Sequence, residues 1–467
     1  MRTQNTKYLG RTGKTQNPKI SPDIFKAYDI RGVYPKEINE ETVYKIAQAY
    51  AKFLNFPKRV ALGKDVRLSS PSLWRAAAKG LTDCGVNVVD IGTGSTDMYY
   101  FATANYNLDG GMMISASHND KEYNGIKMVR ENSIPISGDT GIYDIKKLVL
   151  EGFSYSVDKK GKVEKIDILN DYINKIISFV EPNKIKKFRI IANTNFGMAG
   201  KVLEKIAIYV PTDIIKLNFD PDGNFPKGKP DPLIAENRKE MSQMVVDKNA
   251  DFGVVWDADA DRCFFIDRKG RFMEGSYVLA ILAKIMLAKN PGAKVIADPR
   301  IVGPTKKATE KAGGKLILSK AGHSFIKERM RKEDAVYAGE NSGHYFFRDF
   351  FYCDNGMIPL LLIMEYLSES DKDLADLNDY YIKNFSVSGE INLPIGKDTS
   401  RIFKKLKEEY PDGEQNLMDG LSITYSDWRF NLRASNTESL VRLNVEASSQ
   451  KILEEKKDEL LCAIKEN

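Results

Sequence analysis

The sequence predicts an α/β protein with three domains of similar build and a smaller C-terminal α+β domain. At the usual size of about 150 residues per domain, the 467 residues suffice for three domains or four. Strand-like and helix-like segments alternate in three successive stretches, which is the pattern of βαβ units and favours a largely parallel sheet in each. The C-terminal stretch departs from this alternation and ends in a highly charged helical tail.

The first α/β domain is predicted from residues 58–92. An apolar run at 58–66 is followed by residues 70–85, whose helical composition ends at Gly85. Residues 86–92 are again strand-like, because apolar and β-branched side chains dominate them.

The same order of strand and helix recurs further along the chain. The second stretch has a helix-like segment up to Val180, a strand at 188–194, a helix at 200–210 and a strand at 251–257. The third stretch has a helix at 277–290, a strand at 293–299, a helix ending at Lys311 and a strand at 314–320. The last domain is marked by strand-like segments at 386–393 and 421–435.

Changes in composition place the boundaries. We expect a flexible tail at 1–22 and then four domains, at 23–158, 159–268, 269–373 and 374–467.

The composition excludes several classes of function. The net charge is +6, and five basic residues precede the first acidic one, Asp23, so the rest of the chain is nearly neutral and we expect no nucleic-acid partner. No apolar run reaches the roughly 18 residues that span a bilayer, so we expect no membrane partner. The four cysteines form no CxxC pair, which favours a reducing, cytoplasmic location over a disulfide framework or a zinc ribbon.

Four polar loops carry groups that suit catalysis or binding. In the first, Ser115, Ser117, His118 and Asn119 follow a strand-like run, at the place where open α/β sheets bind ligands. Side chains of neighbouring residues usually point apart, so the Ser117–His118 pair does not imply a Ser-His-Asp triad. A generic turn is the alternative interpretation of this segment.

The second loop places Asp257, Asp259 and Asp261 at alternate positions after an apolar strand. In an extended segment such residues share one face, where three carboxylates suit Mg²⁺. A calcium-binding EF-hand is excluded, because Arg262 and Arg268 stand where Gly and Glu are required. An aspartyl-phosphate phosphatase would leave the serine loop unexplained, and a solvated acidic turn is the remaining alternative.

The other two loops suit a sugar and a phosphate. Glu340 and Ser342 flank Asn341 and precede His344, a set that can bind the hydroxyls of a polyol. A basic, hydroxylated turn that can cradle a phosphate dianion is formed by Arg433, Ser435, Asn436 and Thr437, with Arg442 as reinforcement. Alone, the first of these loops would be better interpreted as a polar turn before a strand, and the second would be a weak signal, because basic and hydroxylated turns are common.

Seven short motifs, in order, resemble those of the α-D-phosphohexomutases, and in particular the phosphomannomutase/phosphoglucomutase group. They are FKAYDIRG (25–32), GKDVR (63–67), SASHN (115–119), DADADR (257–262), AGHS (321–324), GENSGH (339–344) and RASNTES (433–439). The resemblance implies three α/β mixed-sheet domains and a C-terminal α+β domain around a central cleft, with one loop from each domain.

The resemblance also implies residue roles. Ser117 would carry a phosphoryl group, and Mg²⁺ would be held by Ser117, Asp257, Asp259 and Asp261. Glu340 and Ser342 would bind sugar hydroxyls, and the substrate phosphate would be bound by Arg433, Ser435, Asn436 and Thr437. The matching positions that support the cleft are Tyr28, Arg31, Lys127, Arg262, Arg300, His323 and His344. The group that moves the hydroxyl proton stays open among Arg31, Lys127 and a histidine such as His118.

The implied activity is the interconversion of hexose 6-phosphate and hexose 1-phosphate, with a hexose 1,6-bisphosphate as intermediate and activator. The segment at 130–142 favours mannose phosphates as substrates, with glucose phosphates second, while Asn341 departs from the residues common in relatives. The alternatives are a phosphoglucosamine mutase, a Mg²⁺-dependent sugar phosphatase and a sugar-phosphate-binding relative without turnover. We expect small sugar phosphates as partners and a monomer or weak homo-oligomer.

Overall fold

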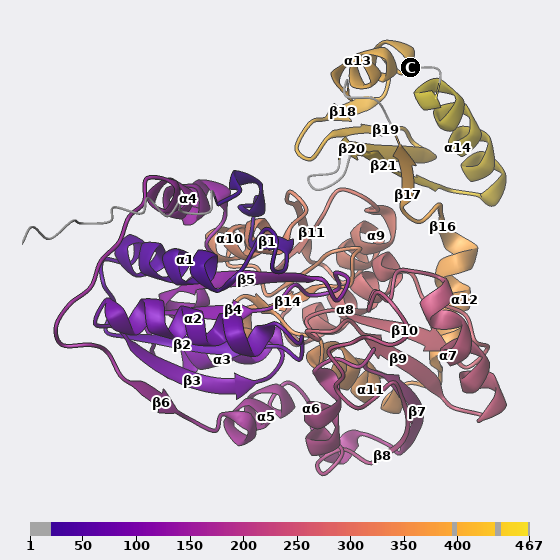
Figure 1. The fold of residues 1–467 in the computed structure, drawn as a ribbon. Coiled ribbons are helices and arrows are strands. Elements are labelled where there is room, and N and C mark those ends of the chain that lie inside the picture. The colour runs from indigo at the N-terminus through magenta and orange to yellow at the C-terminus, as the bar shows by residue number, and fades with distance from the viewer. Residues whose placement is uncertain (1–19, 395–398, 435–439, 466–467) are drawn as a thin grey trace, which may run out of the picture.

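The computed structural model describes residues 20–394, 399–434 and 440–465 (Figure 1). Within these ranges the chain forms four sheets, each accompanied by helices. Three mixed sheets precede a C-terminal sheet, so the predicted fold class is confirmed. Most of the predicted tail, residues 1–19, lies outside the described part of the chain.

The first sheet has the strand order β1-β5-β4-β2-β3-β6. Strands β2, β3, β4 and β6 are parallel, whereas β5 is antiparallel to both β4 and β1, so the sheet is mixed. The strands are β1 (Ile30–Val33), β2 (Arg59–Lys64), β3 (Asn87–Thr93), β4 (Gly110–Ile114), β5 (Tyr123–Arg130) and β6 (Val163–Lys165). Strand β6 joins this sheet although the sequence places its residues in the second domain.

The helices of this unit are α1 (Glu40–Phe53), α2 (Ser70–Asp83), α3 (Thr96–Asn105) and α4 (Tyr143–Leu150). Helix α1 begins where the Asn39 side chain accepts a hydrogen bond from the Thr42 N–H at 3.0 Å. Helices α1 and α2 pack closely because Gly80 has no Cβ, which would lie 2.6 Å from the Tyr44 carbonyl oxygen.

The second sheet has the order β10-β9-β7-β8. Its strands are β7 (Phe188–Asn193), β8 (Thr212–Leu217), β9 (Phe252–Trp256) and β10 (Cys263–Asp267), and its helices are α5 (Leu169–Ile177), α6 (Ala199–Ile206) and α7 (Glu236–Asp247). Strands β7, β8 and β9 are parallel, and β9 and β10 form an antiparallel pair. The acidic loop at 257–262 is therefore the turn between two buried strands.

The third sheet has the order β12-β11-β13-β14-β15. Its strands are β11 (Lys294–Ala297), β12 (Lys315–Leu318), β13 (Tyr337–Gly339), β14 (Tyr345–Phe347) and β15 (Cys353–Asp354), and its helices are α8 (Gly275–Lys289), α9 (Gly303–Lys311), α10 (His323–Glu333) and α11 (Ile358–Ser368). The sugar loop at 340–344 joins the antiparallel strands β13 and β14.

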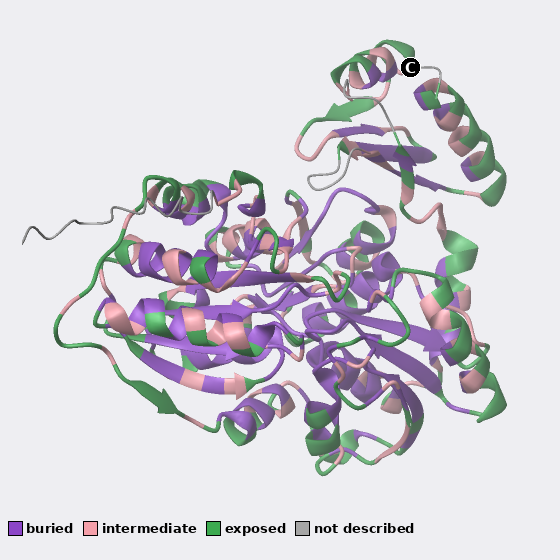
Figure 2. Ribbon diagram, viewed as in Figure 1, coloured by how far each residue is buried: buried purple, intermediate pink, exposed green. Residues whose placement is uncertain are grey.

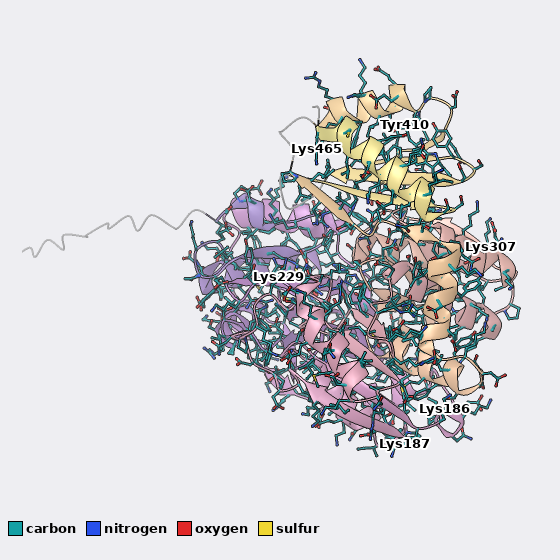
Figure 3. All side chains as sticks on the ribbon, turned by 90° about the vertical axis from the view of Figure 1, so that its right-hand side faces the viewer. Lys186, Lys187, Lys229, Lys307, Tyr410 and Lys465 are labelled. Carbon is teal, nitrogen blue, oxygen red and sulfur yellow. The ribbon has the colours of Figure 1, made fainter. Side chains whose placement is uncertain are left out.

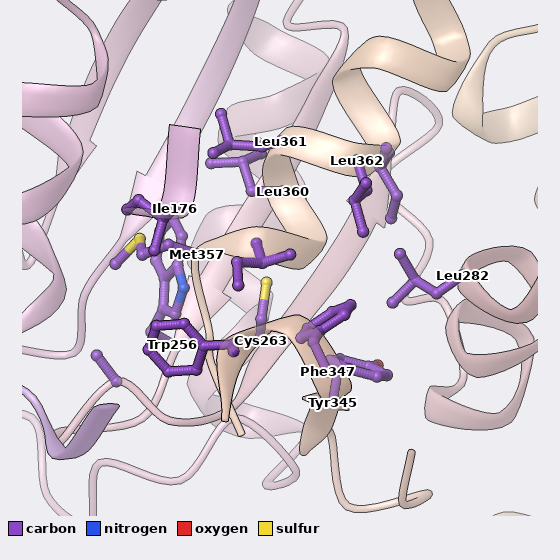
Figure 4. Close-up of a cluster of buried hydrophobic side chains, with 14 of the residues drawn as sticks. Ile176, Trp256, Cys263, Leu282, Tyr345, Phe347, Met357, Leu360, Leu361 and Leu362 are labelled. Carbon is purple, nitrogen blue, oxygen red and sulfur yellow. The ribbon is translucent and has the colours of Figure 1, made fainter. Parts of the chain in front are cut away.

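One hydrophobic core runs through these three units. Trp256, Cys263, Met357 and Leu361 belong to it together with Ile176, so it joins side chains of the second and third units (Figure 4). Buried residues of the first unit, among them those of α3, belong to the same core. Figure 2 shows buried residues along the strands and exposed residues on the outer helices. The three units therefore share apolar surface that none of them buries alone.

The C-terminal unit is a sheet of antiparallel strands with its own core. Its strands are β16 (Ser386–Val387), β17 (Ile391–Pro394), β18 (Glu414–Asn416), β19 (Leu421–Thr424), β20 (Trp428–Ala434) and β21 (Leu440–Ala447), and its helices are α13 (Thr399–Glu409) and α14 (Gln450–Lys465). Figure 3 shows this unit, with Tyr410 and Lys465, projecting from the rest of the molecule.

A buried ion pair attaches the C-terminal unit to the third one. The Glu446 carboxylate accepts hydrogen bonds from the N–H groups of Val302 and Gly303, at 2.8 and 2.7 Å. Arg429 contacts Glu446 at 2.7 Å and donates to the carbonyl oxygens of Arg300 and Pro299. The loop that carries Arg300 is thus held by the C-terminal unit.

Helix α12 (Leu374–Asn384) packs on the main body, although the sequence places it in the fourth domain. The Asn378 amide donates to Asp267 at 3.0 Å, and the ring of Tyr381 stacks on that of Tyr277 at 5.3 Å. None of the helices in the described part of the chain combines the length and apolar character needed to cross a membrane.

Candidate active site

A cavity of about 660 Å³ lies where the four units meet. All the described residues predicted for the nucleophile, the sugar and the phosphate line it: Tyr28, Arg31, Ser117, His118, Lys127, Arg262, Arg300, His323, Glu340, Ser342, His344, Arg433 and Arg442. Three predicted phosphate-binding residues, Ser435, Asn436 and Thr437, lie outside the described residues. The described parts of these loops therefore border one space, which the acidic loop reaches through Arg262, while Asp257, Asp259 and Asp261 are not among the residues that line it.

Ser117 lies in the loop between β4 and β5, with a φ of 49°. A serine rarely adopts this left-handed conformation, so the surrounding loop must hold it there. The Ser117 N–H donates to the Ser115 hydroxyl at 3.0 Å, and the Ser117 hydroxyl donates to Asp257 at 2.8 Å. The hydroxyl thus points from the first unit toward the acidic loop of the second.

The His118 side chain does not point away from Ser117, as neighbouring side chains usually do. Its Nδ1 lies 3.2 Å from the Ser117 Oγ, because the left-handed turn brings the two side chains together. Burial, and then the charges of Arg262 and Arg31, lower the pKa of His118 well below its usual value. The same causes oppose protonation of the imidazole. The serine hydroxyl donates directly to the carboxylate of Asp257, which is not the arrangement of a Ser-His-Asp triad.

Arg67, to which the sequence assigns no role, holds the serine loop from behind. Its guanidinium is fully buried and donates to the carbonyl oxygens of Ser117 and Asn119 at 2.6 and 2.7 Å. It also donates to the carbonyl oxygens of Asp120 and Tyr123 at 2.7 and 3.1 Å. The only sequence signal is its place in the GKDVR motif, directly after a strand.

Asp257, Asp259 and Asp261 converge as predicted, but the segment is not extended: it turns, with a φ of 59° at Ala260 and a hydrogen bond of 3.1 Å from the Ala260 N–H to the Asp257 carbonyl oxygen. One carboxylate oxygen of each lies within 4.8 Å of the others, and all three side chains are buried. Lys127 contacts Asp259 and Asp261 at 2.8 and 2.5 Å. Arg262 donates to Asp257 at 2.9 Å. Two cations thus offset part of the charge of three carboxylates.

The charges that remain make this cluster suited to a cation. Burial and the repulsion of Asp259 raise the pKa of Asp261 well above its usual range. Burial also opposes the charge of Asp259, but Lys127 and Thr96 hold the pKa of Asp259 well below its usual range. The Oδ1 atoms of Asp259 and Asp261 are buried, and no hydrogen-bond partner for either lies among the described residues. Hard oxygen ligands left in this state fit a divalent cation such as Mg²⁺.

Arg31 borders the serine loop on the cavity side. Its Nε donates to Asp29 at 2.8 Å, and its Nη1 donates to the Asn119 side chain at 2.5 Å. Burial opposes its charge, but Asp29 raises the pKa of Arg31 above its usual value. Arg31 therefore keeps its positive charge against the serine loop, where it also donates to the Ala116 carbonyl oxygen at 3.2 Å.

Glu340 and Ser342 follow strand β13 and face the cavity from the third unit. The Glu340 carboxylate accepts a hydrogen bond from the Gly322 N–H at 2.7 Å. Burial raises the pKa of Glu340 to about 7, and Arg300 partly offsets this rise. The Ser342 hydroxyl lies 3.1 Å from the His344 Nδ1 and 3.4 Å from the Arg300 Nη2.

Arg300 is oriented by Asp298, which sequence reasoning missed. The guanidinium donates to both carboxylate oxygens of Asp298, each at 2.8 Å. Asp298 also accepts from the backbone N–H of Asn341 at 2.7 Å. A single buried carboxylate thus fixes both Arg300 and the sugar loop.

The three histidines all lie at the cavity and are neutral. The ring of His323 lies 5.3 Å from that of Tyr28 and 6.4 Å from that of His344. Burial lowers the pKa of His323 and of His344 well below the usual value, as it does for His118.

Arg433 and Arg442 are opposite each other on β20 and β21. Both contact the Glu390 carboxylate, Arg433 at 3.3 Å and Arg442 at 3.2 Å. Glu390 was not predicted as a site residue, because the segment around it reads only as a strand. The two arginines are the described part of the predicted phosphate loop.

Four stretches of the chain match known domain families. Residues 22–155 match "Phosphoglucomutase/phosphomannomutase, alpha/beta/alpha domain I". Residues 170–270 and 274–385 match alpha/beta/alpha domains II and III of the same name, and residues 390–462 match its C-terminal domain. A phosphomannomutase of Escherichia coli K12 is 45% identical over 433 residues, which cover 91% of this chain and 94% of that protein.

The chain belongs to the phosphoglucomutase/phosphomannomutase family. Phosphohexose mutases of Xanthomonas campestris are 44% identical over 424 residues, which cover 90% of this chain and 94% of theirs. A phosphoglucomutase/phosphomannomutase family protein of Burkholderia thailandensis, known as a crystal structure, has 30% identity and a TM-score of 0.87, covering 96% of this chain and 98% of that one. The family resemblance predicted from the seven motifs is confirmed, and this member of the phosphoglucomutase/phosphomannomutase family is a phosphohexose mutase.

Proposed function

We propose that this mutase interconverts mannose 6-phosphate and mannose 1-phosphate, with glucose phosphates as second substrates, through a phosphoserine at Ser117 and a hexose 1,6-bisphosphate. The observation that carries the proposal is the hydrogen bond of 2.8 Å from the Ser117 hydroxyl to Asp257, within a cavity lined by all four units. The phosphomannomutase relatives at 43–45% identity support mannose phosphates as the main substrates.

Asp257, Asp259 and Asp261, together with the Ser117 phosphate, would hold Mg²⁺. Bound there, Mg²⁺ supplies positive charge to the phosphoryl group during its transfer. Lys127 keeps Asp259 and Asp261 in place, and Arg262 does the same for Asp257. These cations stabilise charge without an activated nucleophile.

In the first transfer, the bond between the Ser117 oxygen and phosphorus breaks as a sugar hydroxyl oxygen bonds to that phosphorus, and the proton that the hydroxyl loses is matched by the proton that the freed Ser117 oxygen takes up. The bisphosphate then turns by about half a revolution in the cleft, and its other phosphoryl group returns to Ser117. When Ser117 takes this group its own proton must leave, and two groups contact its hydroxyl: the Asp257 carboxylate at 2.8 Å and the His118 Nδ1 at 3.2 Å. Arg31 and Lys127 stay protonated and act as charge stabilisers.

Glu340 and Ser342 would bind the sugar hydroxyls, with Arg300, His323, His344 and Tyr28 around them. Glu340 and Ser342 stand on the same loop, so they can contact two neighbouring hydroxyls of one ring. The distal phosphate would bind Arg433, Ser435, Asn436 and Thr437, with Arg442 in support.

Incubation with mannose 1-phosphate and Mg²⁺ tests the proposal. We expect mannose 6-phosphate with little free phosphate, and intact mass should show one added phosphate that Ser117→Ala lacks. Stoichiometric release of phosphate would indicate a phosphatase, and binding without either product would indicate a relative without turnover. A higher kcat/KM for glucosamine 1-phosphate than for mannose 1-phosphate would show that the protein is a phosphoglucosamine mutase and not a phosphomannomutase.

A further inference from the structure

Three arginine side chains from two units surround one carboxylate in the cavity. Glu390 lies 3.3 Å from Arg433 and 3.2 Å from Arg442 of the C-terminal unit. It also lies 3.6 Å from the Nη1 of Arg300, which belongs to the third unit. The Glu390 carboxylate is therefore in the position where arginines from both sides of the cleft meet.

The arginines differ in what compensates them. Arg300 already has a two-point contact with Asp298, so it does not depend on Glu390 for its charge or its orientation. Arg433 and Arg442 are directly opposite on adjacent strands, where like charges repel each other, and among the described residues Glu390 is a carboxylate that contacts both. Glu390 thus offsets the repulsion between the two described arginines of the phosphate loop.

The position of Glu390 is open enough for its side chain to move. A quarter of the side chain is exposed, and it lines the same cavity as Ser117 and Glu340. Gly389 precedes it with a φ of 66°, and an added Cβ at Gly389 would find no atom within 4 Å. The backbone after Glu390 is fixed, since Ile391 pairs with Leu443. A rotation of the side chain alone can therefore take the carboxylate away from the arginines.

We propose that Glu390 is an internal counter-anion, which occupies the anion position of the phosphate subsite in the free enzyme and gives way to the phosphate of the substrate. This inference rests on the proposed function, because it assigns the subsite to a sugar phosphate. A phosphate dianion carries more charge than one carboxylate and forms more hydrogen bonds with guanidinium groups, so it displaces Glu390. Glu390 returns when the phosphate leaves.

The exchange has a consequence for the reorientation of the bisphosphate. One phosphate must leave the arginines before the other can replace it. Separating a phosphate dianion from two or three guanidinium groups in the cavity costs electrostatic free energy. The returning carboxylate compensates the arginines during this interval. Glu390 thus lowers the affinity of the subsite for phosphate, and the same effect makes it easier for the bisphosphate to leave the arginines and reorient.

Binding of inorganic phosphate to the full chain measures the first part. We expect Glu390→Gln to bind phosphate about tenfold more tightly than the wild type by calorimetry, since a like charge beside the anion is removed. Glu414→Gln, an exposed change on β18, should leave the affinity unchanged, and Glu390→Gln/Arg433→Ala should lose the gain. Unchanged or weaker binding by Glu390→Gln would overturn the inference and assign Glu390 to alignment of the arginines.

Turnover measures the second part. With mannose 1-phosphate, Glu390→Gln should lower KM and kcat together, whereas a loss of arginine alignment would raise KM. If Glu390→Gln folds poorly, as judged by its thermal midpoint, Glu390→Asp should give a smaller change in the same direction, and a rise in KM there would also contradict the inference. If the wild type fails to convert mannose 1-phosphate while Glu390→Gln still binds phosphate more tightly, the proposed function is wrong, but the role of Glu390 as a counter-anion is still supported.

Discussion

The hydroxyl of Ser117 donates a hydrogen bond to the carboxylate of Asp257, at 2.8 Å, across the boundary between the first two units. The two residues are far apart in the sequence, yet this contact joins the serine loop to the acidic loop. When Ser117 carries a phosphoryl group, the donor proton is replaced by negative charge, so serine phosphate and carboxylate repel each other. A cation between them turns that repulsion into attraction.

We therefore predict that phosphorylation of Ser117 raises the affinity for Mg²⁺. A chelator should abolish activity, and Mg²⁺ should restore it. At one fixed concentration, a hundred times the dissociation constant of the unphosphorylated enzyme, Mg²⁺ should add about 2.7 kcal/mol to the free energy of unfolding of that form, seen as a rise in thermal midpoint. The rise should be larger for phosphorylated enzyme and absent in Asp261→Asn, while Asp412→Asn, an exposed control, should keep it. An equal rise in both phosphorylation states would contradict the prediction.

Arg67→Lys should slow catalysis without weakening substrate binding. A lysine ammonium cannot reach the four carbonyl oxygens that Arg67 contacts, so Ser117 would leave its left-handed conformation. We expect kcat to fall about a hundredfold with KM little changed. The free energy of unfolding should fall by about 1–3 kcal/mol.

The control for Arg67→Lys is Arg59→Lys, which changes an exposed arginine on strand β2. Steady-state kinetics and chemical denaturation of both variants provide the measurement. If Arg67→Lys loses stability but keeps its kcat, Arg67 stabilises the fold and does not determine the conformation of Ser117.

The pH dependence of kcat/KM should have an acidic limb set by Glu340. Burial raises the pKa of Glu340 to about 7, so its carboxylate, the form that would accept a hydrogen bond from a sugar hydroxyl in the proposed role, predominates only above that pH. We expect kcat/KM to rise through pH 7. Arg300 lowers the pKa of Glu340, so Arg300→Gln should move the limb upward by about one pH unit, whereas Arg300→Lys should keep it near its wild-type position. If the acidic limb of the pH profile stays at the same pH in Arg300→Gln, the group that titrates there is not Glu340.

Glu446→Ala should loosen the C-terminal unit. It removes the acceptor for the N–H groups of Val302 and Gly303 and leaves Arg429 without this carboxylate. We expect KM to rise by about tenfold, because a loss near 1.4 kcal/mol in positioning the phosphate loop corresponds to that factor. Limited trypsin digestion should cleave faster after Lys383, near the connection to β16.

Glu414→Ala, on an exposed strand of the same unit, serves as the control for Glu446→Ala. It should change neither KM nor the rate of cleavage. Equal protease resistance of Glu446→Ala and the wild type would show that other contacts hold the unit.

Local patterns were enough to predict the fold class and the main loops. The alternation of strands and helices predicted the three α/β units, because it depends on neighbours in the chain. The seven motifs gave the family for the same reason. Asp257, Asp259 and Asp261 converge as predicted, but through a turn at Ala260 and not through the extended segment on which the prediction rested. The roles of the site residues stay predictions until they are tested by substitution.

The remaining features depend on contacts between distant segments. Arg67 holds carbonyl oxygens some fifty positions further along the chain, and Glu390 meets arginines from other strands and another unit. Helix α12 contacts the main body through Asn378 and Tyr381, but nothing in the sequence of the helix indicates which unit it packs against. The approach of His118 to Ser117 follows from one positive φ, which no residue type in the loop announces.

The separate core of the C-terminal unit makes that unit exchangeable. Most of its apolar residues pack among themselves, while another core draws on all three preceding units, and the contact between Ser117 and Asp257 lies between the first and second units. A chimera that takes residues 390–462 from another family member should therefore fold. Such a chimera would replace the residues proposed to bind the substrate phosphate and keep the loops that carry Ser117 and Asp257. The range of substrates could therefore change, in evolution or by engineering, without a change in the groups proposed for phosphoryl transfer.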